Sequence, residues 1–443
     1  MAPDPELNER IKDAFRRMLD SADASIADRV RLAVEPHRPG FNDGTIMPPE
    51  AFPAGTSTAT IARAASDRAP LRGTVRVVVV LVEFPDRPLS PDATVEHFRE
   101  LFFSTGRKIP TGSVREYYSE VTHDLVTIDG EVVGPYTLPQ NLSTYAHNSS
   151  GVGDETPNAR TMARDALLAA DADVDFDPYD NDGNGYVDAF IVVHAGPGAE
   201  STGQNGDIWS HKWTLDGGVK SVDRTKVYGY LTIPEDARIG VCAHELGHLL
   251  FGWPDLYDTD QSSEGIGNWC LMAAGSWNGR GDTPAHPNGF LKVDQGWANR
   301  TDQTANGTVV LPDVKANHEV LRLWHDGVAN TEYFLLENRQ RTGFDAALPG
   351  DGLLIWHIDE TVDNNRDENH YRVALMQADG MRNLEHNANR GDAGDPFPGS
   401  NNNLSFTAST NPASTSYAGV DVGVAVTEIG ASSATVTANI RVR

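Results

Sequence analysis

The chain opens with an amphipathic pattern that soon gives way to an aperiodic stretch. Apolar residues recur there at the three- and four-residue spacing of a helix: Ile11, Phe15, Met18 and Leu19. We expect this helix between residues 7 and about 32. Pro, Gly, Ala, Ser and Thr dominate residues 37–69, which is typical of a linker or a segment lying over a surface. The pattern therefore predicts an N-terminal helix and linker over residues 1–72.

Two long apolar runs predict buried strands. The run VRVVVVLVEF begins at Val75 and the run FIVVHAG begins at Phe190, and both are rich in β-branched residues, as in strands covered on both faces. The segments VEHFRELFF and ARTMARDALLAA lie between them and have helical periodicity. Because buried strands alternate with helices, we expect an α/β (α+β) catalytic domain over residues 73–300.

After residue 300 the pattern changes to short apolar runs. Gly, Asn, Asp and Pro separate these runs, as they separate the strands of β-rich domains. The runs are TVVLPDV, HEVLRLWH, EYFLLEN, GLLIWHID, YRVALMQ and ATVTANIRV. We predict an all-β, sandwich-like C-terminal domain over residues 301–443.

Charge and hydropathy exclude two classes of partner. The 443 residues include 36 Lys and Arg against 63 Asp and Glu, a formal net charge of −27 that would repel nucleic acid. No apolar run approaches the roughly 20 residues needed to cross a bilayer, so we expect no membrane span. The opening residues MAPDPELNER show no secretory signal. We expect a monomer.

The segment RIGVCAHELGHLLFGWPDLYD, which begins at Arg238, contains an HExxH motif. Its apolar stripe, ended by a Gly and a Pro, predicts a helix. His244 and His248 are then one turn apart on one face, where two neutral imidazoles can share a tetrahedral Zn²⁺. Glu245 lies beside them without being needed as a ligand, and it can accept a proton from a zinc-activated water as that water attacks a carbonyl. The motif predicts a zinc-dependent hydrolase.

A catalytic zinc needs a third protein ligand, and two carboxylates compete for that role. Asp255 resembles the last ligand of the extended metzincin motif HExxHxxGxxD, although the additional Phe251 delays the glycine and the aspartate by one residue each. Glu264, in SSEGIGNW, is the rival, since a loop that folds back under the helix could present it. The sequence leaves both alternatives open.

Several stretches, in order, resemble the immune inhibitor A family of zinc metallopeptidases. They include FDPYDNDGNGYVDAFIVVHAGPG, HELGHLLFGWPDLYDTD, IGNWCLMAAGSW, YFLLENRQRTGFDAALPGDGLLIWHIDE and NRGDAGDPFPG. The resemblance implies a zincin-type endopeptidase that is extracellular, acts on polypeptides and contains one catalytic zinc and structural calcium. It covers most of the chain from Val75 to about Gly399, and it leaves residues 1–72 as a candidate remnant of a pro-segment.

Met272 resembles the methionine that lies beneath the metal in metzincins. If it has that place, Cys242 and Cys270 come together, as a disulfide or as a close pair of buried thiols.

An acidic loop before the second buried strand predicts a calcium site. Its spacing fits the start of a Dx[DN]x[DN]G loop, in which alternate oxygens point inward. The candidate ligands are Asp180, Asp182, Asn184, Asp188 and the carbonyl of Tyr186. The twelfth position is Ile191 rather than the bidentate Glu of an EF-hand, so we expect a structural Ca²⁺ rather than a calcium sensor.

Two other functions stay open. One is a catalytically silent, calcium-braced binding or adhesion protein, and the other is a zinc hydrolase of a non-peptide amide. Glu245 argues against the first, because a structural zinc site has no use for a base. The favoured prediction is a zinc-dependent endopeptidase with Glu245 as its general base.

Overall fold

The computed structural model describes residues 1–20, 38–324 and 327–443. By their contacts these residues divide into two units, Met1–Pro254 and Asp255–Arg443. The domain limits expected from the sequence, 72/73 and 300/301, differ from this single division and stay predictions. The first predicted helix is present as α1 (Pro5–Asp20), and the remainder of its predicted range lies outside the described residues.

A five-stranded sheet forms the centre of the first unit, in the order β2-β1-β3-β7-β4. β1 is parallel to both β2 and β3, β3 is parallel to β7, and β4 is antiparallel at the edge. Residues 77–82 of β1 are fully buried, as expected of a continuous apolar run covered on both faces. The strands of this unit are β1 (Gly73–Glu83), β2 (Val126–Thr137), β3 (Phe190–His194), β4 (His211–Thr214), β5 (Lys220–Val222), β6 (Thr225–Val227) and β7 (Gly229–Pro234).

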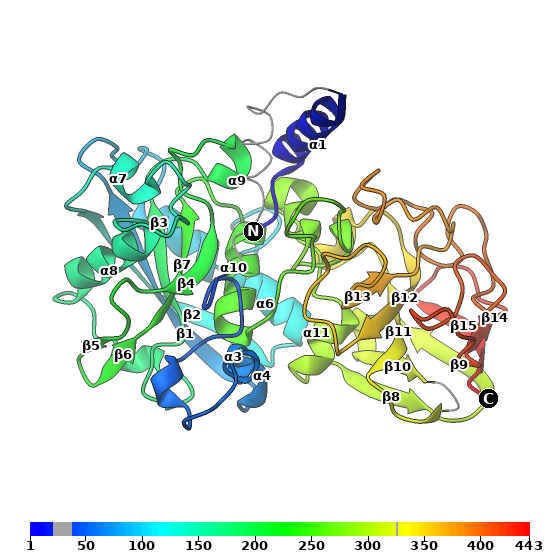
Figure 1. Ribbon diagram of the computed structural model, residues 1–443. Coiled ribbons are helices and arrows are strands. Elements are labelled where there is room, and N and C mark those ends of the chain that lie inside the picture. Colours follow the sequence, from blue (N-terminus) through cyan, green and yellow to red (C-terminus); the bar gives the residue numbers. More distant parts are fainter. Residues whose placement is uncertain (21–37, 325–326) are drawn as a thin grey trace. The chain divides into compact units, whose positions relative to one another are not determined.

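Helices pack against this sheet. α5 and α6 contact β2, α8 contacts β1 and β2, and α10 contacts β7 and β4 (Figure 1). The helices, short 3₁₀ turns included, are η1 (Pro49–Ala51), α3 (Thr58–Ala62), α4 (Ala64–Asp67), α5 (Val95–Phe103), α6 (Val114–Thr122), α7 (Leu142–Ala146), α8 (Ala159–Ala170), η2 (Asp177–Tyr179), α9 (Ala199–Thr202) and α10 (Ile239–Phe251). Both predicted strands and both predicted helices are present, so the mixed α/β prediction is confirmed.

The second unit contains two sheets, in the orders β13-β12-β11-β10-β8 and β14-β15-β9. Its strands are β8 (Asn299–Gln303), β9 (Gly307–Pro312), β10 (Glu319–Leu323), β11 (Glu332–Arg339), β12 (Gly352–Asp359), β13 (Val373–Leu375), β14 (Ala425–Thr427) and β15 (Thr435–Arg441). Its helices and 3₁₀ turns are η3 (Gly267–Trp269), η4 (Ala274–Gly281), α11 (Gly289–Asp294), α12 (Val314–Asn317) and η6 (Gly343–Ala347). Each of the six short runs singled out in the sequence contains a strand.

One hydrophobic core is shared by the two sheets of this unit. Leu336 and Ile355 come from the larger sheet, and Val436 and Ile440 come from the smaller one. Side chains of β15 alternate between exposed and buried, which is the pattern of a strand with one face on a core. The unit is rich in strands as predicted, while the finer description as a sandwich stays a prediction.

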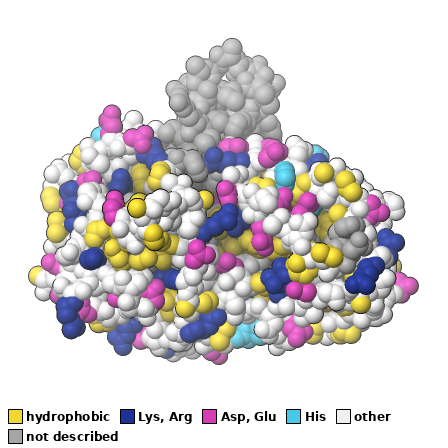
Figure 2. All heavy atoms as spheres, turned by 60° about the horizontal axis from the view of Figure 1, so that its bottom comes forward, with side chains coloured by type: hydrophobic (Ala, Val, Ile, Leu, Met, Phe, Trp, Pro, Cys, Tyr) yellow, Lys and Arg dark blue, Asp and Glu magenta, His cyan; other side chains and the backbone are white. Residues whose placement is uncertain are grey.

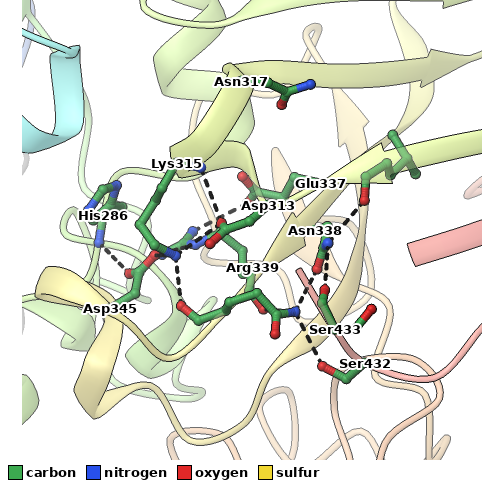
Figure 3. Close-up of polar contacts among 12 residues, drawn as sticks. His286, Asp313, Lys315, Asn317, Glu337, Asn338, Arg339, Asp345, Ser432 and Ser433 are labelled. Atoms are coloured by element: carbon green, nitrogen blue, oxygen red, sulfur yellow. Dashed lines mark hydrogen bonds and ion pairs between the residues drawn. The ribbon is translucent and has the colours of Figure 1, made fainter. Parts of the chain in front are cut away.

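Next to β11 lies a buried group of charges that we call the Arg339 cluster. It comprises three cationic and three carboxylate side chains: Lys292, Lys315, Arg339, Asp313, Glu337 and Asp345. Figure 3 labels all of these except Lys292. Arg339 donates through Nε to Asp345 Oδ2 at 2.8 Å and through Nη2 to Asp345 Oδ1 at 2.5 Å. Lys315 Nζ lies 3.0 Å from Asp313 Oδ1 and 3.5 Å from Asp345 Oδ2. The chain thus balances these buried carboxylates with cations of its own.

Acidic and basic side chains are interspersed on the face shown in Figure 2. On that face the described residues form no continuous basic surface of the kind that binds a nucleic acid backbone. Among the described segments, no helix combines the length and the apolar character needed to cross a bilayer.

Candidate metal centre

Helix α10 positions the HExxH motif. All of its 13 residues are buried, so its sequence is apolar on every side except at the motif. Gly252 ends the helix at φ +66°, and a Cβ at this position would lie 2.3 Å from that of Ala65. Only glycine accommodates both the left-handed backbone and this close approach. Tyr118 lies beneath the helix and donates its hydroxyl to the carbonyl of Ala243 at 2.7 Å.

The two motif histidines point their Nε2 atoms toward each other. These atoms are 3.2 Å apart, close to the separation of about 3.3 Å that Zn–N bonds of about 2.0–2.1 Å produce in a tetrahedron. Nδ1 of His248 lies 2.6 Å from the carbonyl oxygen of Trp253. Because a carbonyl only accepts, this contact places the ring proton on Nδ1 and leaves Nε2 of His248 for a metal.

Asp255 completes this group. The ligand atoms of His244, His248 and Asp255 lie within 4.8 Å of one another, and all three side chains are buried. Glu264, its sequence rival, instead accepts a hydrogen bond from Nε of Arg390 at 3.0 Å. Backbone contacts fix the neighbourhood of Asp255, since the amide of Leu256 donates to the carbonyl of Met272 at 2.7 Å. Two imidazoles and one carboxylate are a donor set that suits Zn²⁺ with a further position open for water.

Glu245 is fully buried on the same helix, between the two histidines in sequence. The amino group of Met1 lies 3.4 Å from its Oε1. The indole of Trp209 donates to the carbonyl of Met1 at 2.9 Å, and Leu7 and Ile11 of α1 pack against Trp209. The N-terminal residues therefore lie at the carboxylate that the sequence predicts to be the base.

Of the five predicted calcium ligands, three carboxylates converge. Asp180, Asp182 and Asp188 offer oxygens within 4.8 Å of one another. Asn184 uses its Oδ1 to accept from the amide of Tyr186 at 2.9 Å. Arg68 also reaches this loop, because its Nη1 lies 2.8 Å from Asp188 Oδ1 and 3.1 Å from Asp182 Oδ2.

Arg68 also donates through Nη2 to the carbonyl of Leu250 on α10. It therefore connects the acidic loop to the helix that carries the HExxH motif. Burial raises the pKa of Asp188 and Asp182 adds to this effect, while Arg68 acts against it. A cation in this loop would favour the ionised carboxylates.

Three further histidines, His194, His211 and His357, form hydrogen bonds within their own surroundings. Burial lowers the pKa of His194 to about 4 and that of His211 to about 3. His211 contacts the Tyr230 hydroxyl at 2.8 Å, and His357 contacts Glu332 at 2.9 Å. Burial therefore favours the neutral rings of His194 and His211.

Both cysteines are free and buried, so the first alternative, a disulfide between them, is wrong, and the second, a close pair of buried thiols, stays a prediction. Cys242 lies on α10, where burial raises the pKa of its thiol well above the ordinary value. Cys270 accepts from the amide of Asn288 at 3.4 Å. The expectation used the position of each cysteine two residues before a motif residue, His244 or Met272. Such an offset in sequence does not fix the direction of a side chain.

Three contacts at these sites escaped the sequence. Arg68 reaches the acidic loop from a linker without periodicity, Met1 reaches Glu245 from the start of the chain, and Trp253 orients His248 through its carbonyl. A backbone carbonyl leaves no mark in a sequence. Positions 68 and 182 are far apart along the chain, so no local pattern indicates that a basic residue lies near the acidic loop.

The sequence of this chain is similar to the sequences of known peptidases. Residues 67–304, more than half of the chain, match the family model "Immune inhibitor A peptidase M6, catalytic domain". The chain is similar to immune inhibitor A of Bacillus thuringiensis subsp. alesti, with 34% identity over 261 residues, which are 47% of this chain and 38% of that protein. It is also similar to the pre-pro-metalloprotease PrtV of Vibrio cholerae serotype O1, with 33% identity over 257 residues, 47% of this chain and 28% of that protein.

The match confirms the resemblance inferred from the motifs. The chain spans well under half the length of these relatives.

Proposed function

The chain belongs to the immune inhibitor A family of M6 peptidases, and from this premise we propose that it is a zinc-dependent endopeptidase acting on polypeptides. The observation that carries the proposal is the convergence of His244, His248 and Asp255 around one point, on and just after the helix that carries Glu245. These three residues would hold Zn²⁺, with Asp255 rather than Glu264 as the third ligand.

Bound zinc would lower the pKa of a water molecule to about 7 and polarise the scissile carbonyl. Glu245 would accept the proton of that water as it attacks the peptide carbon, and would then deliver the proton to the leaving amine. The carbonyl of Trp253 would hold His248 in the tautomer that leaves Nε2 free. Burial of α10 fixes the relative positions of base and ligands before substrate arrives.

Replacement of the base tests the mechanism directly. We expect Glu245→Gln to lower casein proteolysis by about 10²–10⁴-fold while the zinc content, measured by atomic absorption, stays near one ion per chain. Equal proteolysis by both proteins would reject the role of Glu245. A protein that binds zinc but cleaves only small amides would favour the alternative of a non-peptide amide hydrolase, and inactivity of the native protein on both substrates would favour a binding protein.

The third ligand has its own matched pair of variants. Asp255→Asn is expected to weaken zinc binding at least about tenfold, whereas Glu264→Gln removes a partner of Arg390 and leaves zinc affinity unchanged. Zinc competition with a chromogenic chelator measures both. The reverse outcome would assign the ligand to Glu264.

We further propose that residues 1–72 act as a pro-segment that covers the base. Met1 lies at Glu245, and the helix behind it is held by Leu7 and Ile11 against Trp209. Leu7→Asp/Ile11→Asp should detach α1 without shortening the chain, because charge is costly on a buried apolar contact. We expect higher casein activity from this variant. Unchanged activity in a folded protein would count against covering by this segment.

A structural Ca²⁺ at Asp180, Asp182 and Asp188 and an extracellular location also belong to the proposal. Hard carboxylate oxygens suit calcium, and the family resemblance favours secretion. Chelation followed by resupply of zinc alone should leave the chain less thermostable than in calcium. Recovery of the protease from the culture medium of its source would support the location, and confinement to the cell pellet would contradict it.

A further inference from the structure

A second acidic group lies in the Asp255–Arg443 unit and has no part in the proposed peptidase chemistry. Asp379, Asp392 and Asp395 offer carboxylate oxygens within 4.8 Å of one another. Asp392 and Asp395 belong to NRGDAGDPFPG, a segment for which the proposed zinc and calcium sites provide no role.

Hydrogen bonds orient all three carboxylates. Oδ1 of Asp379 accepts from the amide of Met381 at 2.9 Å. Oδ2 of Asp392 accepts from Nδ2 of Asn389 at 2.7 Å. Oδ2 of Asp395 accepts from the indole of Trp269 at 3.0 Å and from the amide of Asp392 at 3.0 Å. The orientations are therefore fixed, and Oδ2 of Asp379 and Oδ1 of Asp395 are left to face the other carboxylates or a ligand.

Asp395 supplies an independent indication of a ligand. Its side chain is fully buried, with an exposed fraction of 0%, and its Oδ1 has no hydrogen-bond partner among the described residues. A buried carboxylate oxygen without a partner is costly, because water cannot replace the missing contact. A bound cation would remove that cost.

The space beside the carboxylates is kept open by Gly394. A Cβ at this position would lie 2.6 Å from Asp379 Oδ2 and 3.0 Å from Asp392 Oδ1. The hydrogen bonds to Met381 and Asn389 use the other oxygen of each carboxylate. Asp392 Oδ1 itself accepts from the amide of Gly394 at 2.7 Å. The backbone thus approaches the acidic group where any side chain would intrude.

In the parts of the chain that the structure describes, no Lys or Arg forms an ion pair with Asp379, Asp392 or Asp395. Three carboxylates within a few ångströms repel one another strongly when one of them is fully buried. An all-oxygen group of this charge matches Ca²⁺, which binds six to eight oxygens, better than Zn²⁺, which prefers four ligands that include nitrogen or sulfur.

We propose that Asp379, Asp392 and Asp395 form a calcium site that fastens the 379–395 segment to Trp269. The site is separate from the Asp180–Asp188 loop and from the zinc ligands. It would stabilise the part of the chain that leads from η3 to Met272, because Trp269 donates directly to Asp395. Water and backbone oxygens would complete the coordination.

Terbium luminescence tests the proposal on the full, zinc-loaded chain, with Tb³⁺ as the probe for Ca²⁺. Excitation of tryptophan should give sensitised Tb³⁺ emission, because the Trp269 indole is hydrogen-bonded to a ligand, and added Ca²⁺ should quench it by competition. Asp379→Asn/Asp392→Asn should remove this emission and lower Ca²⁺ affinity at the site by at least about tenfold. The matched control is Asp180→Asn/Asp182→Asn, which should retain both.

Calcium stoichiometry by equilibrium dialysis gives the second readout, and it does not depend on proteolysis. One ion fewer per chain is expected in the Asp379→Asn/Asp392→Asn protein than in the native protein. Equal stoichiometry, or emission lost only in the Asp180→Asn/Asp182→Asn control, would overturn the proposal. If the double variant does not fold, Gly394→Ala decides, because it keeps every charge but fills the space: weakened calcium binding supports the site, and native affinity overturns it.

Discussion

Two groups of carboxylates in the Asp255–Arg443 unit, each with at least one fully buried member, have opposite electrostatic surroundings. In the Arg339 cluster, burial opposes ionisation of Asp345, but Arg339, His286 and Lys315 outweigh it and hold the pKa of this carboxyl far below its usual range. In the Asp379–Asp392–Asp395 group, burial and then the neighbouring carboxylates raise the pKa of Asp395 to about 7. Both groups are held by hydrogen bonds, so the difference lies in the source of positive charge.

The comparison teaches how to distinguish a structural ion cluster from a metal site. A cluster that contains its own guanidinium and ammonium groups is complete as folded, whereas a converging acidic group without them needs an ion from solution. The Asp180–Asp188 loop lies between these cases, because Arg68 reaches two of its three carboxylates. Dependence on added calcium should therefore rise from the Arg339 cluster through the loop to the Asp395 group.

The largest effect is expected where the chain supplies its own cation. Asp345→Asn leaves the guanidinium of Arg339 without its bidentate partner, and breaking such a buried pair costs about 3–5 kcal/mol. Urea denaturation should show this loss equally with calcium and with chelator. The exposed pair of Arg99 and Glu96 provides the control, since Glu96→Gln should change stability little. A loss that calcium restored would contradict the comparison.

Calcium itself should have the next largest effect. Ligand at about 100 times its dissociation constant stabilises a folded protein by about 2.7 kcal/mol. Thermal unfolding of the zinc-loaded chain should therefore shift upward on addition of calcium. Asp395→Asn should reduce this shift, and a variant shift equal to that of the native protein would remove the Asp395 group from the calcium-binding sites.

Arg68 should determine how strongly the stability of the Asp180–Asp188 loop depends on calcium. Arg68→Gln removes charged hydrogen bonds, each worth about 1.5–3 kcal/mol, and it leaves Asp182 and Asp188 without the cation that pairs with them. We expect lower stability in chelator and a larger stabilisation by calcium than in the native protein. Arg99→Gln is the matched control at an exposed position. Equal calcium effects in all three proteins would show that Arg68 and calcium do not compete for the loop.

The structural elements differ in how well the sequence predicts them. The strands β1 and β3 followed from continuous apolar runs, and α10 followed from its stripe and its terminal glycine. The histidine pair followed from helical spacing alone. Local periodicity was sufficient for all of these, because the residues that decide them are neighbours in the chain.

The remaining features depend on contacts between distant positions. Arg68 forms an ion pair with Asp182, Asp379 lies close to Asp392, and Trp269 donates a hydrogen bond to Asp395 only after the fold has formed. Sequence left Asp255 and Glu264 as equal rivals, because the partner that distinguishes them, Arg390, is far away in the chain. The prediction of a disulfide was wrong for a related reason, since Cys242 and Cys270 lie in different segments and their positions in sequence do not fix how the two side chains face each other.

A single carboxylate outside both groups offers the smallest and sharpest test. Glu200 is buried, and among the described residues its carboxylate accepts hydrogen bonds from Ser210, from the hydroxyl at 2.5 Å and from the backbone amide at 3.0 Å. Burial raises its pKa to about 7, although Ser210 opposes this. Between the ordinary value of 4.5 and about 7 the folded chain therefore retains a proton that the unfolded chain has released.

Raising the pH through this window should thus destabilise the native protein relative to Glu200→Gln, by at most about 1.4 kcal/mol per pH unit. Urea titrations of both proteins between pH 4.5 and 7 measure the difference, which should be insensitive to calcium because one carboxylate cannot build a calcium site. Parallel stability curves would show that burial alone does not raise the pKa of Glu200. The neighbouring carboxylates would then become the main reason for the raised pKa of Asp395.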